Sequence, residues 1–472
     1  MAKTPLRSRY EPPSQRQKAA VNLAPIDIFH VLAAISALLV FAHLGASLAA
    51  RIGIPPMVGE LTGGILLGAT VFRRIWPEGH AWLLPVAPSP VAPILGFCST
   101  IGLLMLLYIG GLQLRRLITA RDTRAVGWIS ALGVLIPVGA GLLVLQVVDV
   151  SKYLGSANQL TALKIVLLIE LAITSIPVIT RIFLDLGLMS SRLARIVLSV
   201  AVIEDVMLYI ALSIALGMAQ AGAKSDASIP HYLGFAPDSA AFIAWHIVAS
   251  LALLAVAAWG FGKAVRPSSR LNPIAERSPL GWTLVSILVI TGAAMFLGLA
   301  PMFGALVAGM IASTDNRPPL VKARQQVEAV GSSFFIPLYF ALIGTSLDLI
   351  RDFDWRLTVG LLILGSAVKY GGALLGARAA GERPAMAHAI SISVNARGGP
   401  GLVVASTAFA AGITNPAAYT SLIILAIVSS VLAAIFLARA LRRSAAAAEL
   451  IGGEEGEASE AGLAVDGSAG RG

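Results

Sequence analysis

Long apolar segments recur along almost the whole of this 472-residue sequence. Most are close to the roughly 20 residues that a helix needs to cross the hydrocarbon core of a bilayer. Hydrophobic residues make up 57% of the chain and charged residues only 13%, a composition far from that of a soluble globular domain. Since backbone polar groups in lipid must be satisfied within their own segment, we expect an all-α polytopic membrane protein with about 13 transmembrane helices. The thirteen segments are 27–50, 56–72, 94–114, 125–149, 161–184, 193–219, 239–265, 280–299, 301–314, 328–349, 357–380, 385–411 and 416–441.

Lys and Arg residues are distributed unevenly among the connecting loops. Twenty lie in loops that follow odd-numbered segments and seven in loops that follow even-numbered ones. Because short basic loops stay in the cytoplasm, this pattern predicts an outside N-terminus and a cytoplasmic C-terminus, although the basic N-terminal tail, 1–26, disagrees. The transmembrane domain is expected at 27–441 and a disordered tail at 442–472. The net charge of +10 is explained by these loops, so we expect no nucleic-acid partner.

Two acids stand side by side within the sixth apolar segment. Glu204 and Asp205 have about eight apolar or small residues on each side, which places them near the middle of the bilayer. A carboxylate at that depth costs several kcal/mol unless it pairs with a cation, binds one or takes up a proton. Neighbours on a helix point about 100° apart, so the two acids cannot share one contact surface. We assign Asp205 to an ion site and Glu204 to a partner lysine.

Two of the apolar segments are interrupted by residues that disfavour continuous helix. The fifth contains Thr174, Ser175 and Pro177, and the twelfth contains Arg397 followed by two glycines, a proline and a third glycine. With thirteen segments, the fifth and twelfth occupy equivalent positions in two halves that flank the seventh. Matching interruptions of this kind are typical of secondary transporters with inverted repeats. A kink without function is the alternative interpretation, mainly for Pro177.

Two more charges lie deep in apolar segments. Lys369, in the eleventh segment, has no opposite charge nearby in the sequence, and we expect Glu204 to be its partner. Glu170 lies four residues before Thr174 and is expected to pair with Arg397 and hold the interrupted helices together.

From residue 27 to 441, in collinear order, the chain resembles the monovalent cation:proton antiporters of the second cation:proton antiporter group, near the Kef and NapA-type branches. The resemblance rests on motifs at 56–68, 102–112, 174–178, 204–205, 303–309, 334–340, 369 and 397–402. It implies a NhaA/NapA-like fold with two crossing interrupted helices, an elevator-type core bundle, a dimerisation panel and a homodimer. The family's ion-binding acid corresponds to Asp205. The position of Glu204 is commonly Asp, Asn or Gln in the family, and an acid there together with Lys369 points to electrogenic exchange.

These residues predict exchange of sodium or lithium for protons, because a proton and a metal ion would compete for the Asp205 carboxylate. Thr174, Ser175 and opened backbone carbonyls are expected to complete an oxygen shell for the cation. The expected setting is a bacterial inner membrane, the expected role is pH homeostasis, and no cofactor is expected. The alternatives are a potassium/proton antiporter, a sodium-coupled organic-anion symporter in which Arg397 contacts substrate, and a scaffold without transport. No phosphate-binding loop or nucleophile elbow indicates an enzyme.

Overall fold

The computed structural model describes residues 24–85, 89–117, 122–220, 228–237, 239–257 and 276–443. The predicted tails are residues 1–26 and 442–472. Residues 1–23 and 444–472 of these tails lie outside the described part of the chain. The described residues are helical and contain no β-strand; one isolated bridge joins Leu154 and Thr414.

The elements fall into long helices, short helices and two pairs of half-helices. In chain order they are α1 (Pro25–Arg51), α2 (Pro56–Leu67), α3 (Phe72–Ile75), α4 (Pro77–Leu83), α5 (Val91–Leu117), α6 (Thr123–Val147), η2 (Ser151–Tyr153), α7 (Leu160–Ala172), α8 (Ile176–Asp185), α9 (Arg192–Gln220), α10 (Ile229–Tyr232), α11 (Ala240–Ala255), α14 (Pro279–Phe296), α15 (Pro301–Ala312), α16 (Pro318–Val330), η4 (Gly331–Phe335), α17 (Ile336–Thr345), α18 (Trp355–Ala379), α19 (Pro384–Ser393), α20 (Gly398–Ala410) and α21 (Pro416–Arg443).

Within the described ranges, nine helical segments are long and apolar enough to cross a membrane. α11 and α15 are apolar but shorter. The predicted segments 56–72 and 301–314 each form a helix of only 12 residues, α2 and α15. The all-helical membrane architecture is therefore confirmed, whereas the count of thirteen spans stays a prediction.

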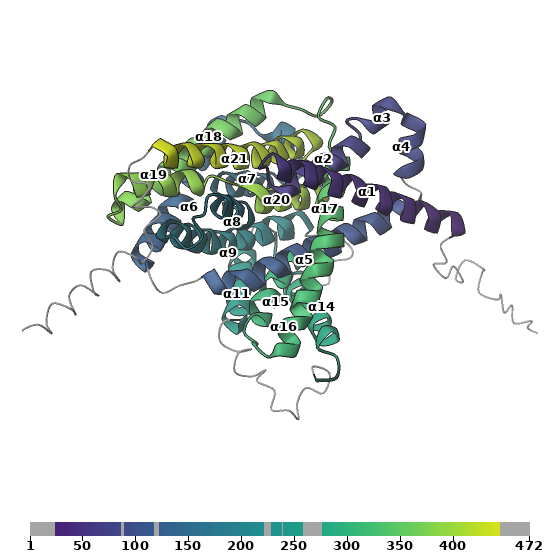
Figure 1. The fold of residues 1–472 in the computed structure, drawn as a ribbon, viewed down its shortest axis with the longest axis horizontal. Coiled ribbons are helices and arrows are strands. Elements are labelled where there is room, and N and C mark those ends of the chain that lie inside the picture. The colour runs from purple at the N-terminus through teal and green to yellow at the C-terminus, as the bar shows by residue number, and fades with distance from the viewer. Residues whose placement is uncertain are drawn as a thin grey trace, which may run out of the picture.

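The helices gather in two groups (Figure 1). The first helix group contains α6 to α9 and α18 to α21; α6 packs on α7, α9 and α18, and α20 packs on α7 and α21. The second helix group contains α1, α2, α5 and α14 to α17; α5 packs on α15 and α17, and α1 packs on α2 and α17. In Figure 1 the first group fills the upper left of the view, while the second extends to the right and below. The groups meet where α9 contacts α5 and α15.

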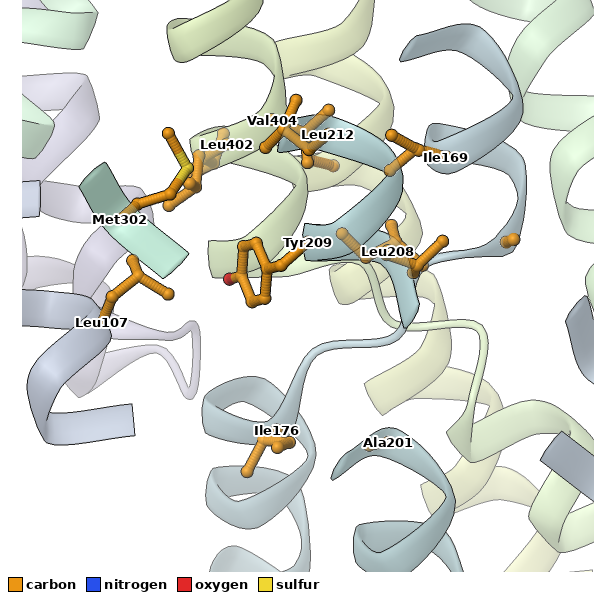
Figure 2. Close-up of a cluster of buried hydrophobic side chains, with 14 of the residues drawn as sticks. Leu107, Ile169, Ile176, Ala201, Leu208, Tyr209, Leu212, Met302, Leu402 and Val404 are labelled. Carbon is orange, nitrogen blue, oxygen red and sulfur yellow. The ribbon is translucent and has the colours of Figure 1, made fainter. Parts of the chain in front are cut away.

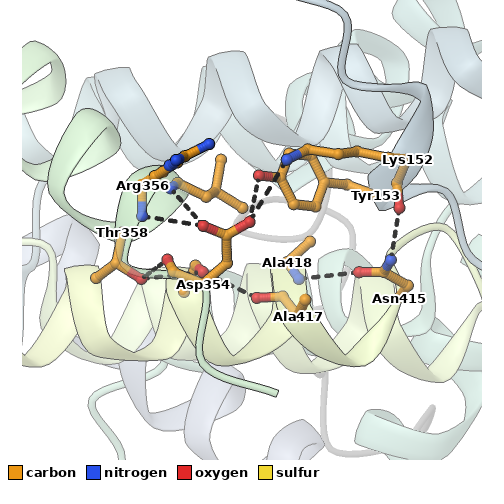
Figure 3. Close-up of polar contacts among 10 residues, drawn as sticks. Lys152, Tyr153, Asp354, Arg356, Thr358, Asn415, Ala417 and Ala418 are labelled. Atoms are coloured by element: carbon orange, nitrogen blue, oxygen red, sulfur yellow. Dashed lines mark hydrogen bonds and ion pairs between the residues drawn. The ribbon is translucent and has the colours of Figure 1, made fainter. Parts of the chain in front are cut away.

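A polar cluster at one end of the first helix group fixes the start of α18 (Figure 3). The Asp354 carboxylate caps α18 by accepting two backbone N–H bonds from its first turn, at 2.9 and 3.1 Å. It also accepts the Tyr153 hydroxyl at 2.7 Å and lies 3.6 Å from the Lys152 ammonium. Asn415, just before α21, donates to the Lys152 carbonyl at 2.8 Å. The cluster therefore ties η2, α18 and α21 together and positions the helix that carries Lys369.

Candidate ion-binding site

The two predicted helix interruptions are present. Residues 173–175 separate α7 from α8, and residues 394–397 separate α19 from α20. Pro177 lies in the first turn of α8, where its missing N–H would have no intrahelical partner in any case. Each proline-containing segment therefore forms two half-helices.

The two interruptions run side by side and bond to each other. The Ser175 amide donates to the Ala396 carbonyl at 2.6 Å, and the Thr174 hydroxyl donates to the Val394 carbonyl at 2.7 Å. The Ser175 hydroxyl accepts the Val178 amide at the start of α8. Backbone groups freed by the interruptions thus find partners across the crossing, as a low-dielectric interior requires.

Gly398 allows the two chains to approach closely at this crossing. Its φ of +39° belongs to the region that glycine tolerates and other residues avoid. A Cβ atom there would lie 2.3 Å from Val178 Cγ2 and 2.7 Å from Ser175 Oγ. Only glycine fits at the first position of α20.

Arg397 joins both interruptions, but not by the ion pair expected from the sequence. Its buried guanidinium donates to the Glu170 backbone carbonyl at 2.7 Å, to the Asn395 side-chain oxygen at 3.1 Å and to the Leu171 carbonyl at 3.5 Å. Both carboxylate oxygens of Glu170 are buried without a hydrogen-bond partner in the described part of the chain. The arginine is held by the end of α7 because the last carbonyls of a helix have no intrahelical partner.

Lys369 is fully buried and pairs with Glu204, as the sequence predicted. Its Nζ atom lies 2.7 Å from Glu204 Oε1 and donates to the carbonyls of Ala172 at 2.5 Å and Gly133 at 3.2 Å. A Cβ atom on Gly133 would come within 3.0 Å of Glu204 Oε1, so the glycine on α6 leaves room for the pair.

Asp205 points to a different place, a cavity between the two helix groups that we call the Asp205 cavity. Its lining includes the first turns of α8 and α20, with Pro177 and Pro400, and Gln113 of α5. The Asp205 side chain is 6% exposed, and its Oδ1 atom has no hydrogen-bond partner among the described residues. The volume of about 50 Å³ exceeds the roughly 10–15 Å³ that one water needs.

Tyr209 also lines the Asp205 cavity, and the sequence analysis missed it. Figure 2 shows its ring extending from α9 toward Leu107, with Met302 nearby. The spacing of Tyr209 from Asp205 could have indicated that it lines the same cavity, because a residue four positions after Asp205 lies on the same helix face.

The half-helix ends complement the buried charges. Asp205 lies beside the first turns of α8 and α20, where the helix dipole favours negative charge. Lys369 and Arg397 donate to carbonyls of the last turn of α7, where the dipole favours positive charge. The arrangement suits one bound cation at Asp205 and the positively charged side chains of Lys369 and Arg397 on the other side of the crossing.

Thr174 and Ser175 lie at the crossing rather than on the wall of the Asp205 cavity. Their hydroxyl groups are engaged by the Val394 carbonyl and the Val178 amide. Of the residues expected to surround the cation, this conformation places only Asp205 on the cavity wall.

The apolar helices and the buried charges between them define an integral multi-pass membrane protein. The chain belongs to the sodium/hydrogen exchanger family, whose model "Sodium/hydrogen exchanger, transmembrane" matches residues 36–443. This is a family of membrane transporters, so the resemblance inferred from the sequence is confirmed at the level of the family.

Individual relatives and a solved structure agree with this assignment. The chain is 25% identical to the Na(+)/H(+) antiporter NhaS4 of Synechocystis sp. over 85% of its own length and 95% of that protein. It is 24% identical to K(+)/H(+) antiporter 1 of Saccharomyces cerevisiae over 80% of its own length, but spans only 42% of that longer protein. Its fold is similar to that of the sodium proton antiporter MjNhaP1 of Methanocaldococcus jannaschii, with a TM-score of 0.54, 14% identity, and coverage of 90% of this chain and 100% of that one.

Proposed function

We propose that this protein is a secondary active antiporter that exchanges a monovalent cation, sodium or lithium, for protons. The observation that carries the proposal is the buried Asp205 carboxylate, whose Oδ1 atom has no hydrogen-bond partner among the described residues and which lies beside a cavity and two half-helix N-termini. The printed activity of the NhaS4 relative, sodium/proton antiport, agrees with this choice of ions. We assign the protein no enzymatic activity.

Exchange follows from competition at one carboxylate. An unpaired carboxylate at this depth is costly, and either a proton or a cation neutralises it. The cation can bind only when the proton has left, so each binding event releases the other ion. Only a neutralised site crosses readily between the two sides, which couples the two movements without a second pathway.

The two helix groups supply a frame for alternating access. We propose that the first helix group carries Asp205 and moves in an elevator fashion against the second, which acts as a dimerisation panel of a homodimer. The matching interruptions in α7–α8 and α19–α20 support inverted repeats within a 13-span domain at 27–441. We place the protein in the Kef/NapA-type group and in a bacterial inner membrane, N-terminus outside and C-terminus cytoplasmic, with a role in pH homeostasis.

The remaining charges have compensating roles in this proposal. Glu204 and Lys369 form an ion pair that reorganises as Asp205 binds or releases its ion, which makes the exchange electrogenic. Arg397, Thr174 and Ser175 hold the crossing together. The Glu170 carboxyl lies within the same buried region.

Potassium is the second candidate cation, because the yeast relative is named a K(+)/H(+) antiporter. The organic-anion symporter is disfavoured by Arg397. Its side chain is completely buried and donates to protein oxygens, so it presents no free surface to a substrate.

Proteoliposomes with an acidic interior and a pH-sensitive dye test the proposal. Sodium, lithium and potassium are added in turn, and the dye signal shows which of these cations drives proton release through the purified protein. Asp205→Asn should abolish the release, whereas the control Asp352→Asn, in the loop before α18, should retain it. Exchange by Asp205→Asn at the wild-type rate would overturn the assignment, and the order of the three cations decides between sodium and potassium.

A further inference from the structure

A second cavity lies beyond the Asp205 cavity along the same two helices. On α5, residues that line the Asp205 cavity fall between 106 and 113, whereas those that line the second cavity fall between 92 and 103. On α20 the corresponding positions are 399–403 and 406–410. The two helices therefore pass the cavities in opposite order, as helices running in opposite directions do. We call the second cavity, of about 540 Å³, the opposite cavity.

The barrier between the two cavities is thin. On each helix the last position of one cavity and the first position of the other are three positions apart, 103 and 106 on α5 and 403 and 406 on α20. At a rise of about 1.5 Å per residue this is about 4.5 Å, less than one helical turn. Both helices therefore bring the two cavities to within one helical turn of each other.

A hydrogen bond joins the two helix groups at the edge of this barrier, on the side of the opposite cavity. The Tyr339 hydroxyl, on α17, lies 2.7 Å from the Ser406 hydroxyl, on α20. The Ser406 hydroxyl also lies within hydrogen-bond distance, 3.1 Å, of the Val403 carbonyl. The Tyr339 side chain is buried, and both hydroxyl-bearing residues line the opposite cavity at its inner end.

Tyr339 is fixed to the second helix group. A Cβ atom on Gly102 of α5 would lie 2.3 Å from the Phe335 carbonyl oxygen and 2.8 Å from Tyr339 Cβ, so α5 and the start of α17 pack backbone to backbone. Ser406 belongs to the half-helix that begins beside Asp205. Movement between the groups therefore stretches this bond directly.

We propose that the Tyr339–Ser406 hydrogen bond is a latch that closes the barrier between the Asp205 cavity and the opposite cavity, and that it breaks when Asp205 becomes accessible from the opposite side. The proposal rests on the proposed function, since it assumes that Asp205 is reached from each side in turn. A hydroxyl–hydroxyl bond is lost within about 1 Å of added separation, so a displacement much smaller than the thickness of the barrier breaks the latch.

A second bond from α17 to the first helix group is weaker. The Tyr419 hydroxyl, on α21, donates to the Ile343 carbonyl at 3.3 Å, near the long limit for such a bond. We expect removal of the Tyr419 hydroxyl to have a smaller effect than removal of the Tyr339 hydroxyl.

Cysteine accessibility tests the latch without any ion gradient. Cys98 is the single cysteine, so Val403→Cys in a Cys98→Ser background gives one reporter at the barrier on the Asp205 side. Vesicles of fixed orientation are treated with a membrane-impermeant maleimide from the side of the opposite cavity. Tyr339→Phe and Ser406→Ala should each raise the labelling rate by roughly two- to tenfold, as expected for loss of one net hydrogen bond. The double variant should label no faster than the singles, because both changes remove the same bond.

Tyr370→Phe is the matched control. Its hydroxyl bonds to His388 between α18 and α19, both in the first helix group, so its removal should leave labelling unchanged. Unchanged labelling in the Tyr339 and Ser406 variants, or a double variant whose effect is the product of the singles, overturns the latch. If the variants label faster but no cation drives proton release from the parent protein, the latch stands and the proposed function fails.

Discussion

Lys369 Nζ lies 2.7 Å from Glu204 Oε1, and neither side chain has any exposed surface. The lysine also donates two hydrogen bonds, to carbonyls of α7 and α6. Asp205, the next residue, turns instead to a cavity. One helix thus carries an acid that is neutralised within the protein beside an acid that is not.

Replacing only one partner of this ion pair should destabilise the protein. Glu204→Gln leaves a buried ammonium without its carboxylate, and Lys369→Met leaves a buried carboxylate without its ammonium. Loss of one partner of a buried pair typically costs about 3–5 kcal/mol. The double variant Glu204→Gln/Lys369→Met should recover much of that loss, as measured by thermal unfolding in detergent. Additive losses in the double variant would show that the pair is not a unit.

Glu204→Gln should keep cation/proton exchange in the folded fraction but change its dependence on membrane voltage. The reason is that the pair alters the charge that moves with Asp205, and one charge across 100 mV is worth about 2.3 kcal/mol. A reversal-potential measurement on proteoliposomes checks this and gives the stoichiometry. If Glu204→Gln abolishes exchange as fully as Asp205→Asn, the two acids form one shared binding site.

Gly309→Ala should destabilise the contact between α15 and α5. A Cβ atom at Gly309 would lie 2.0 Å from the Tyr108 carbonyl oxygen, which belongs to backbone and cannot rotate away. We expect a loss of about 3 kcal/mol, at the upper end for overpacking, seen as a lower unfolding temperature. Gly360→Ala on α18 is the control, since nothing lies within 4 Å of its Cβ position. It should be neutral or stabilising by up to about 1 kcal/mol, and equal losses in both variants would contradict the packing argument.

Asp354 should stabilise the protein at neutral pH and not in strong acid. Burial alone would raise the pKa of this carboxyl group, but bonds from Tyr153 and from the first turn of α18, together with Lys152, hold the pKa below its ordinary value. A depressed pKa in the folded protein means that the contribution is complete above the ordinary Asp pKa of about 3.9 and is lost as pH falls through the folded pKa. Asp354→Ala should therefore lower the free energy of unfolding by about 1–2 kcal/mol at pH 7, and the difference should shrink as pH falls below about 4.

Asp352→Ala serves as the control for this pH profile. Its carboxylate makes no hydrogen bond or ion pair within the residues that the structure describes, although it lies only two positions from Asp354. If the difference in free energy of unfolding between the wild type and Asp354→Ala did not change with pH, the cap would act without its charge.

The sequence by itself determined where two helices are interrupted, and it predicts the depth of the two acids in the membrane. About eight apolar or small residues on each side predict mid-membrane depth for Glu204 and Asp205, and Pro177 with residues 397–401 located both interruptions. These signals are local, because hydrophobic length and proline chemistry act within one segment. Helical geometry also predicted that neighbouring acids face different partners, which the pairing of Glu204 with Lys369 agrees with.

Only the tertiary structure decided which atoms meet. It directed Arg397 to the Glu170 backbone carbonyl instead of the carboxylate, and it engaged the Thr174 and Ser175 hydroxyls at the crossing. It also joined Tyr339 to Ser406 between the two helix groups, although no pattern in either segment predicts this contact. The physical reason is that such partners come from helices far apart in the chain. Their approach depends on how the half-helices cross and where a glycine such as Gly398 lets backbones meet, which no local pattern specifies.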